Sequence, residues 1–244
     1  MKTAKSCRPF RRLILALERE LLPPRCVFCG EETRGTRRRI CRGCHGELVR
    51  NHTACRTCAL PLPGHSDGRC GNCQQGRGAF RFVLAPYIYA FPLDAAIKAF
   101  KFRKRLWYAP AFAELLKASL PALPPGIDAV QPVPLHRWRQ MSRGFNQARE
   151  LAVPVAAALK VPLIDAVRRR RHTPSQSGLS RAERRRNLVG AFRLRGRIDS
   201  RHVLLVDDVV TTATTCRQIA SLLRRHGVRE VSVLALARAL VPDS

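Results

Sequence analysis

The sequence predicts an α/β fold, a doubly wound parallel sheet that follows an N-terminal zinc-binding module. Nine of the ten cysteines lie before residue 80, and beyond that point short apolar segments alternate with longer segments of helical periodicity. Strands that alternate with helices form a parallel sheet with helices on both faces. A third observation supports this class: two adjacent acids, Asp207 and Asp208, follow an apolar strand directly, and such folds bind ligands at the carboxyl ends of their strands.

The expected elements follow from apolar spacing and from the residues that end each segment. A first helix spans residues 10–22, where apolar residues recur at helical intervals until Pro23. Expected strands cover 82–90 (broken at Pro86), 127–133, 203–206 and 230–236, and expected helices cover 93–104, 109–120, 145–159 and 214–226. The chain therefore divides into an N-terminal helix (1–25), a zinc module (26–78) and an α/β domain (79–244).

Composition narrows the class of protein and its partners. The chain has 244 residues, a formal charge of +28 and 45% hydrophobic residues, which excludes intrinsic disorder of the whole chain. No run approaches the ~18 uncharged apolar residues that span a bilayer, and the run Leu13–Leu17 is too short for a signal peptide. We expect a cytoplasmic protein with anionic partners, although an arginine-rich codon bias would give a similar charge.

Eight cysteines form four C-x2-C pairs with a duplicated spacing. Each cysteine of the first two pairs recurs 29 residues later in the chain. Four thiolates complete the tetrahedron of a structural zinc ion and leave no position for catalysis. We predict two structural zinc sites, with consecutive pairing favoured and an interleaved arrangement left open; His45, His52 and His65 are less favoured ligands. The predicted ligands are Cys26, Cys29, Cys41, Cys44, Cys55, Cys58, Cys70 and Cys73.

The segment after the apolar strand 203–206 carries the chemistry. Asp207 and Asp208 are costly to bury and are expected at the strand's carboxyl end, where they could hold a vicinal diol or a magnesium ion through water. A small hydroxyl-rich loop, residues 211–215, precedes the next helix and suits a phosphate group. Phosphate at one end and a diol at the other describe a ribose 5-phosphate. The alternative is a cluster of helix-capping threonines after an acidic turn.

This segment resembles the phosphoribosyl-pyrophosphate (PRPP) binding motif of type I phosphoribosyltransferases, and the whole chain resembles the ComF family of competence-associated proteins with a double zinc ribbon. Further matches are the segments 97–102 (IKAFKF), 133–135 (VPL) and 143–148 (RGFNQA), together with Gln176, Leu179, Arg184, Asn187 and Phe192. One position departs from the family pattern: Ala213 stands where the loop usually has glycine. Because alanine resists positive φ, this replacement could weaken phosphate binding.

The resemblance implies a role for each matching residue. Asp207 and Asp208 would hold the ribose hydroxyls and act in catalysis, and magnesium would accompany PRPP. The 5-phosphate would lie on Thr211, Thr212, Ala213, Thr214 and Thr215. The pyrophosphate or substrate residues would be Lys101, Pro134, Leu135, His136, Arg137, Arg143, Asn146 and Gln147. Asn146 and Gln147 could read a base or could cap and anchor a helix.

Two functions remain open from the sequence. The first is a magnesium-dependent phosphoribosyltransferase that acts on a nitrogenous acceptor, linked to DNA uptake or nucleotide salvage. The second is a non-catalytic competence factor that handles single-stranded DNA, with a helicase or another DNA-processing protein as partner. The second rests on the zinc ribbons and on the block Arg168–Arg197, which holds eleven arginines and one acid. This block occupies the position of a mobile hood in type I phosphoribosyltransferases.

Overall fold

The structure is a computed structural model, and it describes residues 24–33, 38–62, 68–75, 79–135, 141, 143–170 and 190–240. The contacts divide the chain into two compact units, Met1–Glu47 and Leu48–Ser244. The expected N-terminal helix at residues 10–22 lies outside the described residues. No helix in the described part of the chain is long and apolar enough to cross a bilayer.

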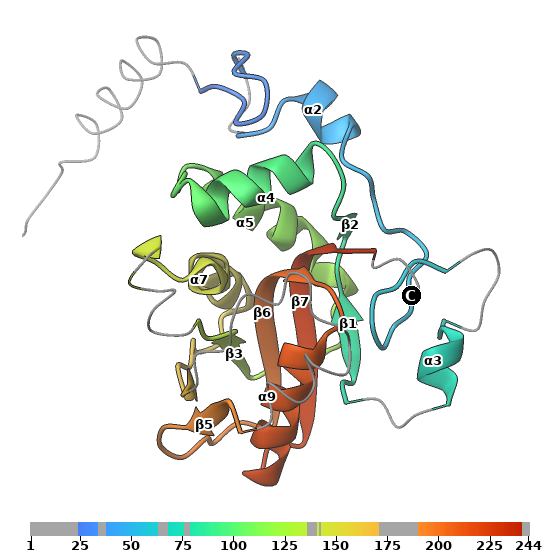
Figure 1. Cartoon of the computed structure of the whole chain (residues 1–244), viewed down its shortest axis with the longest axis vertical. Helices are drawn as coiled ribbons and strands as arrows, with labels where there is room; N and C mark the ends of the chain where they lie inside the picture. Colours follow the sequence, from blue (N-terminus) through green and yellow to red (C-terminus); the bar gives the residue numbers. More distant parts are fainter. Residues whose placement is uncertain are drawn as a thin grey trace, which may run out of the picture. The chain divides into compact units, whose positions relative to one another are not determined.

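A parallel sheet forms the centre of the second unit (Figure 1). Its strand order is β1-β7-β6-β3, and β2 also pairs with β7. The strands are β1 (Phe82–Leu84), β2 (Tyr87–Ile88), β3 (Ala129–Pro132), β6 (His202–Val210) and β7 (Glu230–Arg238). The two longest, β6 and β7, are the inner strands, and their apolar residues are almost all buried. The predicted parallel sheet is therefore confirmed.

Helices cover both faces of this sheet. They are α5 (Tyr108–Ser119), α7 (Gln147–Leu159) and α9 (Thr214–Arg225), and α4 (Leu93–Phe102) packs on α5. Helix α5 packs on α7, and α7 packs on β3 and β6, whereas α9 packs on β7 (Figure 1). The connection from β1 to β3 contains α5 and crosses the sheet in one direction, whereas the connection from β6 to β7 contains α9 and crosses it in the opposite direction. Because both connections are right-handed crossovers, α5 and α9 lie on opposite faces of the sheet. This arrangement is doubly wound, as predicted.

Some elements differ from the expectation. Strand β6 does not end at Val206 but continues to Val210, because its pairing with β7 extends as far as Val210 and Arg238. A second sheet was missed altogether: β4 (Val167–Arg169) and β5 (Phe192–Leu194) pair in antiparallel fashion. Three short helices also lie among the described residues: α2 (Arg42–Gly46), α3 (Gly71–Gln74) and η1 (Leu120–Ala122).

Candidate functional site

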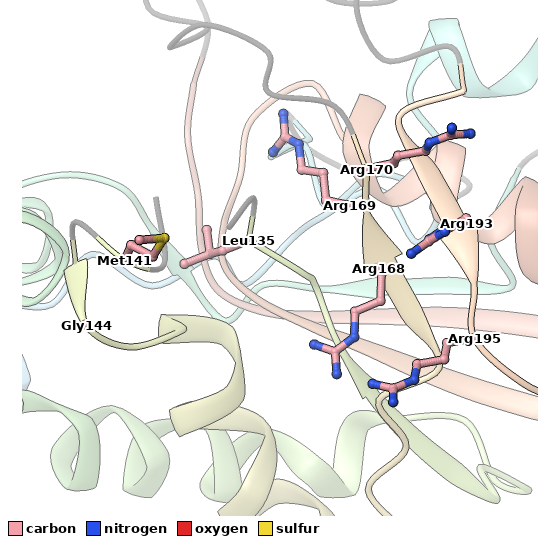
Figure 2. A pocket seen from close by; sticks show the side chains of 8 residues that line it. All are labelled: Leu135, Met141, Gly144, Arg168, Arg169, Arg170, Arg193 and Arg195. Atoms are coloured by element: carbon pink, nitrogen blue, oxygen red, sulfur yellow. The ribbon is translucent and has the colours of Figure 1, made fainter. Parts of the chain in front are cut away.

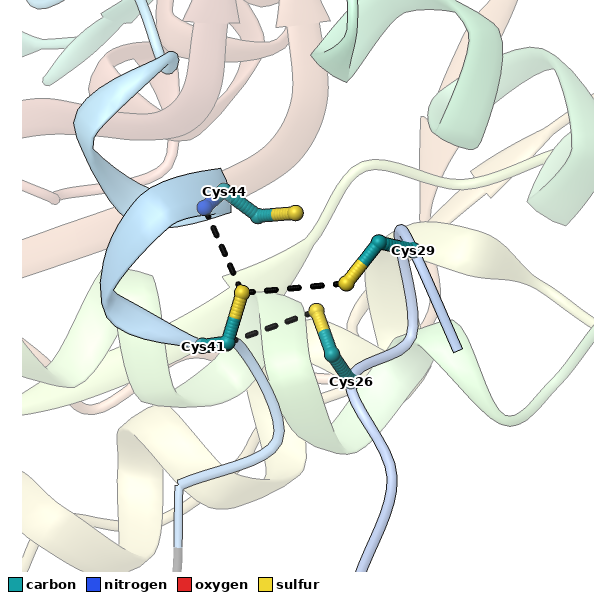
Figure 3. A group of neighbouring side chains, drawn as sticks. All are labelled: Cys26, Cys29, Cys41 and Cys44. Carbon is teal, nitrogen blue, oxygen red and sulfur yellow. Dashed lines mark hydrogen bonds between the residues drawn. The ribbon is translucent and has the colours of Figure 1, made fainter. Parts of the chain in front are cut away.

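The eight paired cysteines form two clusters of four. Cys26, Cys29, Cys41 and Cys44 form the first cluster, and Cys55, Cys58, Cys70 and Cys73 form the second; in each, all four sulfur atoms lie within 4.8 Å of one another. The pairing is therefore consecutive, and among the described residues, which include His45 and His52 but not His65, no histidine joins either cluster. Figure 3 shows the first cluster, with sulfur atoms that point toward a common centre.

The clusters have the dimensions of a four-cysteine zinc site. The Sγ atoms of Cys29 and Cys41 are 3.7 Å apart, as are those of Cys58 and Cys70. A tetrahedron with Zn–S bonds of about 2.3 Å has an edge of roughly 3.8 Å, so a zinc ion fits each set. Backbone N–H groups of Cys41 and Cys44 donate to the Sγ atoms of Cys26 and Cys41 at 3.3 and 3.4 Å, which stabilises thiolate charge in the first cluster.

The two acids lie within strand β6, near its carboxyl end, and not after the strand as expected. They lie beyond the last pairing of β6 with β3, which is Val206 with Pro132, while β7 still pairs with β6 alongside them. One side of β6 is thus unpaired at the acids. Asp208 is buried and Asp207 half-buried, and the Asp207 Oδ1 atom accepts a hydrogen bond from the backbone N–H of Asp208 at 2.9 Å.

Lys101 places a cation beside this acidic pair. Its Nζ atom lies 2.8 Å from Oδ1 of Asp208, and the lysine side chain is only 19% exposed. Helix α4 carries Lys101 in its last turn, so the match of residues 97–102 to the ComF pattern brings a lysine to the acids. The structure therefore places three predicted site residues from distant parts of the sequence within one group.

Burial and charge shift the acid–base behaviour of Asp207. Burial first, and then the neighbouring Asp208 carboxylate, raise the pKa of Asp207 to about 8, and Lys101 opposes this rise. Two carboxylates that share a small space cannot both ionise without a compensating cation. The acidic pair is therefore suited to a ligand that brings positive charge or hydroxyl donors, such as a metal-bound diol.

The hydroxyl-rich loop follows β6 and leads into α9. The Oγ1 atoms of Thr212 and Thr214 are 2.8 Å apart, and Arg217 donates from Nη1 to the carbonyl of Thr212 at 3.2 Å. Ala213 adopts the left-handed conformation, with φ of 55° and ψ of 12°, immediately before α9 begins. Ala213 thus adopts the backbone conformation to which the usual glycine is suited. The first turn of α9 therefore offers backbone N–H groups beside the hydroxyls of the loop.

A buried arginine joins the end of the sheet to the second cysteine cluster. Arg238, the last residue of β7, is 7% exposed. Its Nε atom donates to the carbonyl of Cys58 at 3.0 Å, and its Nη1 atom donates to the carbonyl of Val210 at 3.3 Å. Val210 is the residue before the hydroxyl-rich loop, so one guanidinium bridges a predicted zinc ligand and the base of the predicted phosphate loop.

The turn after β3 is held in place by the start of α7. Asn146 caps α7, because its Oδ1 atom accepts from the backbone N–H of Ala148 at 3.1 Å, and its Nδ2 atom donates to the carbonyl of Val133 at 3.2 Å. The Asn146 amide therefore caps and anchors. Gln147 is 1% exposed; its Oε1 atom accepts from Arg143 Nη1 at 3.1 Å, and its Nε2 atom is buried without a hydrogen-bond partner among the described residues. Asn146 thus holds the end of β3, and Gln147 holds Arg143.

Of the turn itself, Pro134 and Leu135 are described, whereas His136 and Arg137 lie outside the described residues. The Arg143 guanidinium lies over the ring of Phe102 with 4.9 Å between the guanidinium carbon and the ring centroid. Phe102 belongs to α4 and directly follows Lys101. The cation–π contact therefore ties the start of the RGFNQA segment to the helix that carries the lysine of the acidic pair.

The small sheet β4–β5 presents arginines to a cavity of about 750 Å³. Figure 2 shows five arginine side chains around it, with Leu135, Met141 and Gly144 on the other side. The arginines are Arg168, Arg169, Arg170, Arg193 and Arg195. The predicted basic block thus gathers part of its charge around one cavity that also includes Leu135 of the predicted pyrophosphate turn. Gln176, Leu179, Arg184 and Asn187 lie outside the described residues.

Two structural partners of the site could not be found by sequence reasoning. Arg238 lies among many arginines and carries no local signal for burial. Gln131 is fully buried in β3, where its Oε1 atom accepts from the backbone N–H groups of Ala166 and Val167 at 2.9 and 3.3 Å. This amide fixes the start of β4 against the sheet, and a glutamine inside an apolar strand was the one available clue.

Comparisons with known proteins agree with both halves of the chain. The family models that match are the phosphoribosyl transferase domain, over residues 146–241, and the double zinc ribbon domain, over residues 17–74. Competence protein F of Haemophilus influenzae is 35% identical over 227 residues, which cover 88% of this chain and 97% of that protein. DNA utilization protein YhgH of Escherichia coli (strain K12) is 37% identical over 82% of this chain and 91% of that protein. Competence protein ComFC of Bacillus subtilis is 26% identical over 82% and 85%.

Proposed function

The chain belongs to the ComF family, with a double zinc ribbon and a phosphoribosyl transferase domain, and we propose that it is a cytoplasmic enzyme that binds PRPP with magnesium and transfers the ribose 5-phosphate group to a nitrogenous acceptor. The single observation that carries this proposal is the group of Asp207, Asp208 and Lys101 beside the loop of residues 211–215. The acids are buried or half-buried and adjacent, and their cation is 2.8 Å away.

Each part of PRPP has a matching group in this arrangement. The ribose hydroxyls would donate to Asp207 and Asp208, and the 5-phosphate would accept from the hydroxyls and backbone N–H groups of residues 211–215. The pyrophosphate would lie on the turn at Pro134 and Leu135. When the ribose hydroxyls replace Lys101 as the partner of Asp208, the lysine side chain could bind the pyrophosphate. Arg143 adds positive charge beside that turn.

In the proposed reaction, the bond from the ribose C1 atom to pyrophosphate breaks as the bond from C1 to the acceptor nitrogen forms, and the acceptor nitrogen loses a proton. The residues of this chain hold the ribose and both phosphate ends still, and they place cations where negative charge develops. A magnesium ion bound with PRPP would neutralise charge on the departing pyrophosphate. The oxygen donors of Asp207 and Asp208 suit that ion.

The experiment is an assay of pyrophosphate release from PRPP and magnesium, run with a panel of nucleobases and amines as acceptors. We expect release with at least one acceptor and its loss in the Asp207→Asn, Asp208→Asn variant. A matched variant, Asp199→Asn with Glu47→Gln, removes two exposed carboxylates elsewhere and should retain activity. Release that is equal in both double variants would contradict the proposal.

A second candidate function is the non-catalytic handling of single-stranded DNA, which the arginines of β4 and β5 favour. Five guanidinium groups around one cavity could follow a phosphate backbone. Its test is the affinity for single-stranded DNA as a function of salt, which should fall with a slope of about 0.7 for each phosphate contact. An affinity that does not depend on salt would exclude this function.

A further inference from the structure

A second basic cavity lies at the amino-terminal edge of the sheet, away from the acidic pair. Its volume is about 540 Å³, and its walls include Arg56, Thr57, Arg69, Arg81, Phe82 and Leu123. Phe82 pairs with Ser232 near the start of β7, whereas Asp207 pairs with Ala235 further along. The cavity therefore lies between the loop of the second cysteine cluster and the start of the sheet, within the unit Leu48–Ser244. None of the described residues assigned to PRPP lines it.

Backbone hydrogen bonds hold two arginines of this cavity, Arg56 and Arg81, in defined places. The N–H of Arg56 donates to the carbonyl of Gly68 at 2.9 Å, and the carbonyl of Arg56 accepts from the N–H of Val83 in β1 at 2.8 Å. The N–H of Arg81 donates to the carbonyl of Val231 at 2.8 Å. Arg56 is thus fixed to the sheet through β1, and Arg81 is fixed to it through β7.

The absence of a side chain at Gly68 leaves room for the Arg56 side chain. The glycine has φ of +80°, and a Cβ atom there would lie 3.3 Å from Nε of Arg56. Any side chain at residue 68 would press on the guanidinium and would strain the backbone. The glycine thus permits both the turn before Cys70 and the close passage of the arginine.

The described lining of the cavity is positively charged. Three arginines line it, and none of its described lining residues is acidic. Arg81 forms an ion pair with Glu230, which does not line the cavity. Guanidinium groups bind phosphate oxygens through two parallel hydrogen bonds, and the hydroxyl of Thr57 is a further donor. Phe82 and Leu123 add an apolar wall of the kind that contacts a planar ring.

We propose that this cavity is a second phosphate-binding site, which takes the phosphate of a nucleotide, either free or within a single strand. The site is separate from the proposed PRPP site, and its guanidinium groups come from the second zinc ribbon and from the edge of the sheet. The ligand would therefore bridge the ribbon loop and β1.

The test uses the full chain with Asp207→Asn and Asp208→Asn, in the absence of magnesium, so that the PRPP site does not contribute. Fluorescence anisotropy would measure binding of two labelled probes, deoxythymidine triphosphate and an oligothymidylate. We expect Arg56→Gln with Arg69→Gln to weaken binding of the preferred probe by about tenfold or more, which is the effect of losing one or two charge-assisted hydrogen bonds. The probe that binds more tightly identifies the source of the phosphate.

Two comparison variants make the result specific. Arg224→Gln with Arg225→Gln removes the same charge from exposed positions on α9 and should change affinity less than about threefold. Gly68→Ala keeps all the charge but displaces the Arg56 side chain, and it should weaken binding while the zinc content stays unchanged. The proposal would be overturned if neither probe binds, if Arg56→Gln with Arg69→Gln has no effect, or if both arginine pairs have equal effects.

Discussion

The hydrogen bonds of Arg238 allow the effect of a substitution on the free energy of unfolding to be predicted from the structure. We consider Arg238→Met, which keeps an unbranched side chain but removes the guanidinium. The Cys58 carbonyl then loses its partner, and an unpaired buried acceptor costs about 1–3 kcal/mol. The Val210 carbonyl still accepts a hydrogen bond from the N–H of Ala239 at 2.9 Å. Loss of its hydrogen bond from Arg238 therefore costs nearer 1 kcal/mol. The methionine avoids burial of a charge, which offsets part of this cost.

After this offset, the net expectation is a loss of about 2 kcal/mol in the free energy of unfolding, which lowers Tm by roughly 4–8 °C in a domain of this size. Thermal unfolding followed by circular dichroism would measure it, with Arg225→Met as the exposed control. PRPP affinity should fall as well, because Val210 is the base of the phosphate loop. A Tm within about 2 °C of the unmodified chain, with unchanged PRPP affinity, would refute the idea that Arg238 ties the zinc ribbon to the loop.

Four further predictions follow from the same site. Because the pKa of Asp207 is raised to about 8, PRPP binding by the ionised acid should strengthen as pH rises from 6.5 to 9, and this dependence should vanish in Asp207→Asn. The raised pKa also means that Asp207 keeps its proton to a higher pH in the folded state than in the unfolded state. The free energy of unfolding of the unmodified chain should therefore fall over pH 4 to 8 relative to that of the variant. Lys101→Met should move the binding midpoint to higher pH, because Lys101 lowers the pKa of Asp207, and calorimetry across pH would detect the shift. Ala213→Gly should change the free energy of unfolding by less than about 1 kcal/mol in urea titrations, because relief of the left-handed strain is offset by backbone entropy and by a lost buried methyl. Cys58→Ser should lower the Tm of the α/β domain and Cys29→Ser should not, because the second cluster belongs to the same compact unit as the sheet and the first does not.

The order of strands and helices could be predicted because each element carries its own apolar period. The zinc sites could be predicted because four ligands lie close in sequence and repeat. By contrast, β4 and β5 are short and arginine-rich, and they are stabilised by pairing with each other across a long segment, so no local pattern reveals them. The extension of β6 past Val206 was missed because it depends on pairing with β7, which places two acids inside a strand against their local preference.

The sequence shows that the two acids are adjacent, but their electrostatics required the structure. Adjacent acids could be read from the sequence, whereas the 2.8 Å contact of Lys101 with Asp208 depends on where the packing on α5 places α4. The conformation of Ala213 also could not be read from residue type, because alanine disfavours the φ of 55° that the loop imposes. Tertiary contacts decided both points.

Isothermal titration calorimetry of PRPP with magnesium tests the central claim most directly. The unmodified chain should bind PRPP, and Asp207→Asn with Asp208→Asn should weaken binding by about a hundredfold, since at least two charge-assisted hydrogen bonds to the ribose are lost. The matched variant Asp199→Asn with Glu47→Gln should bind like the unmodified chain. No binding to the unmodified chain, or equal binding to both double variants, would contradict the assignment of the acidic pair and its loop to PRPP.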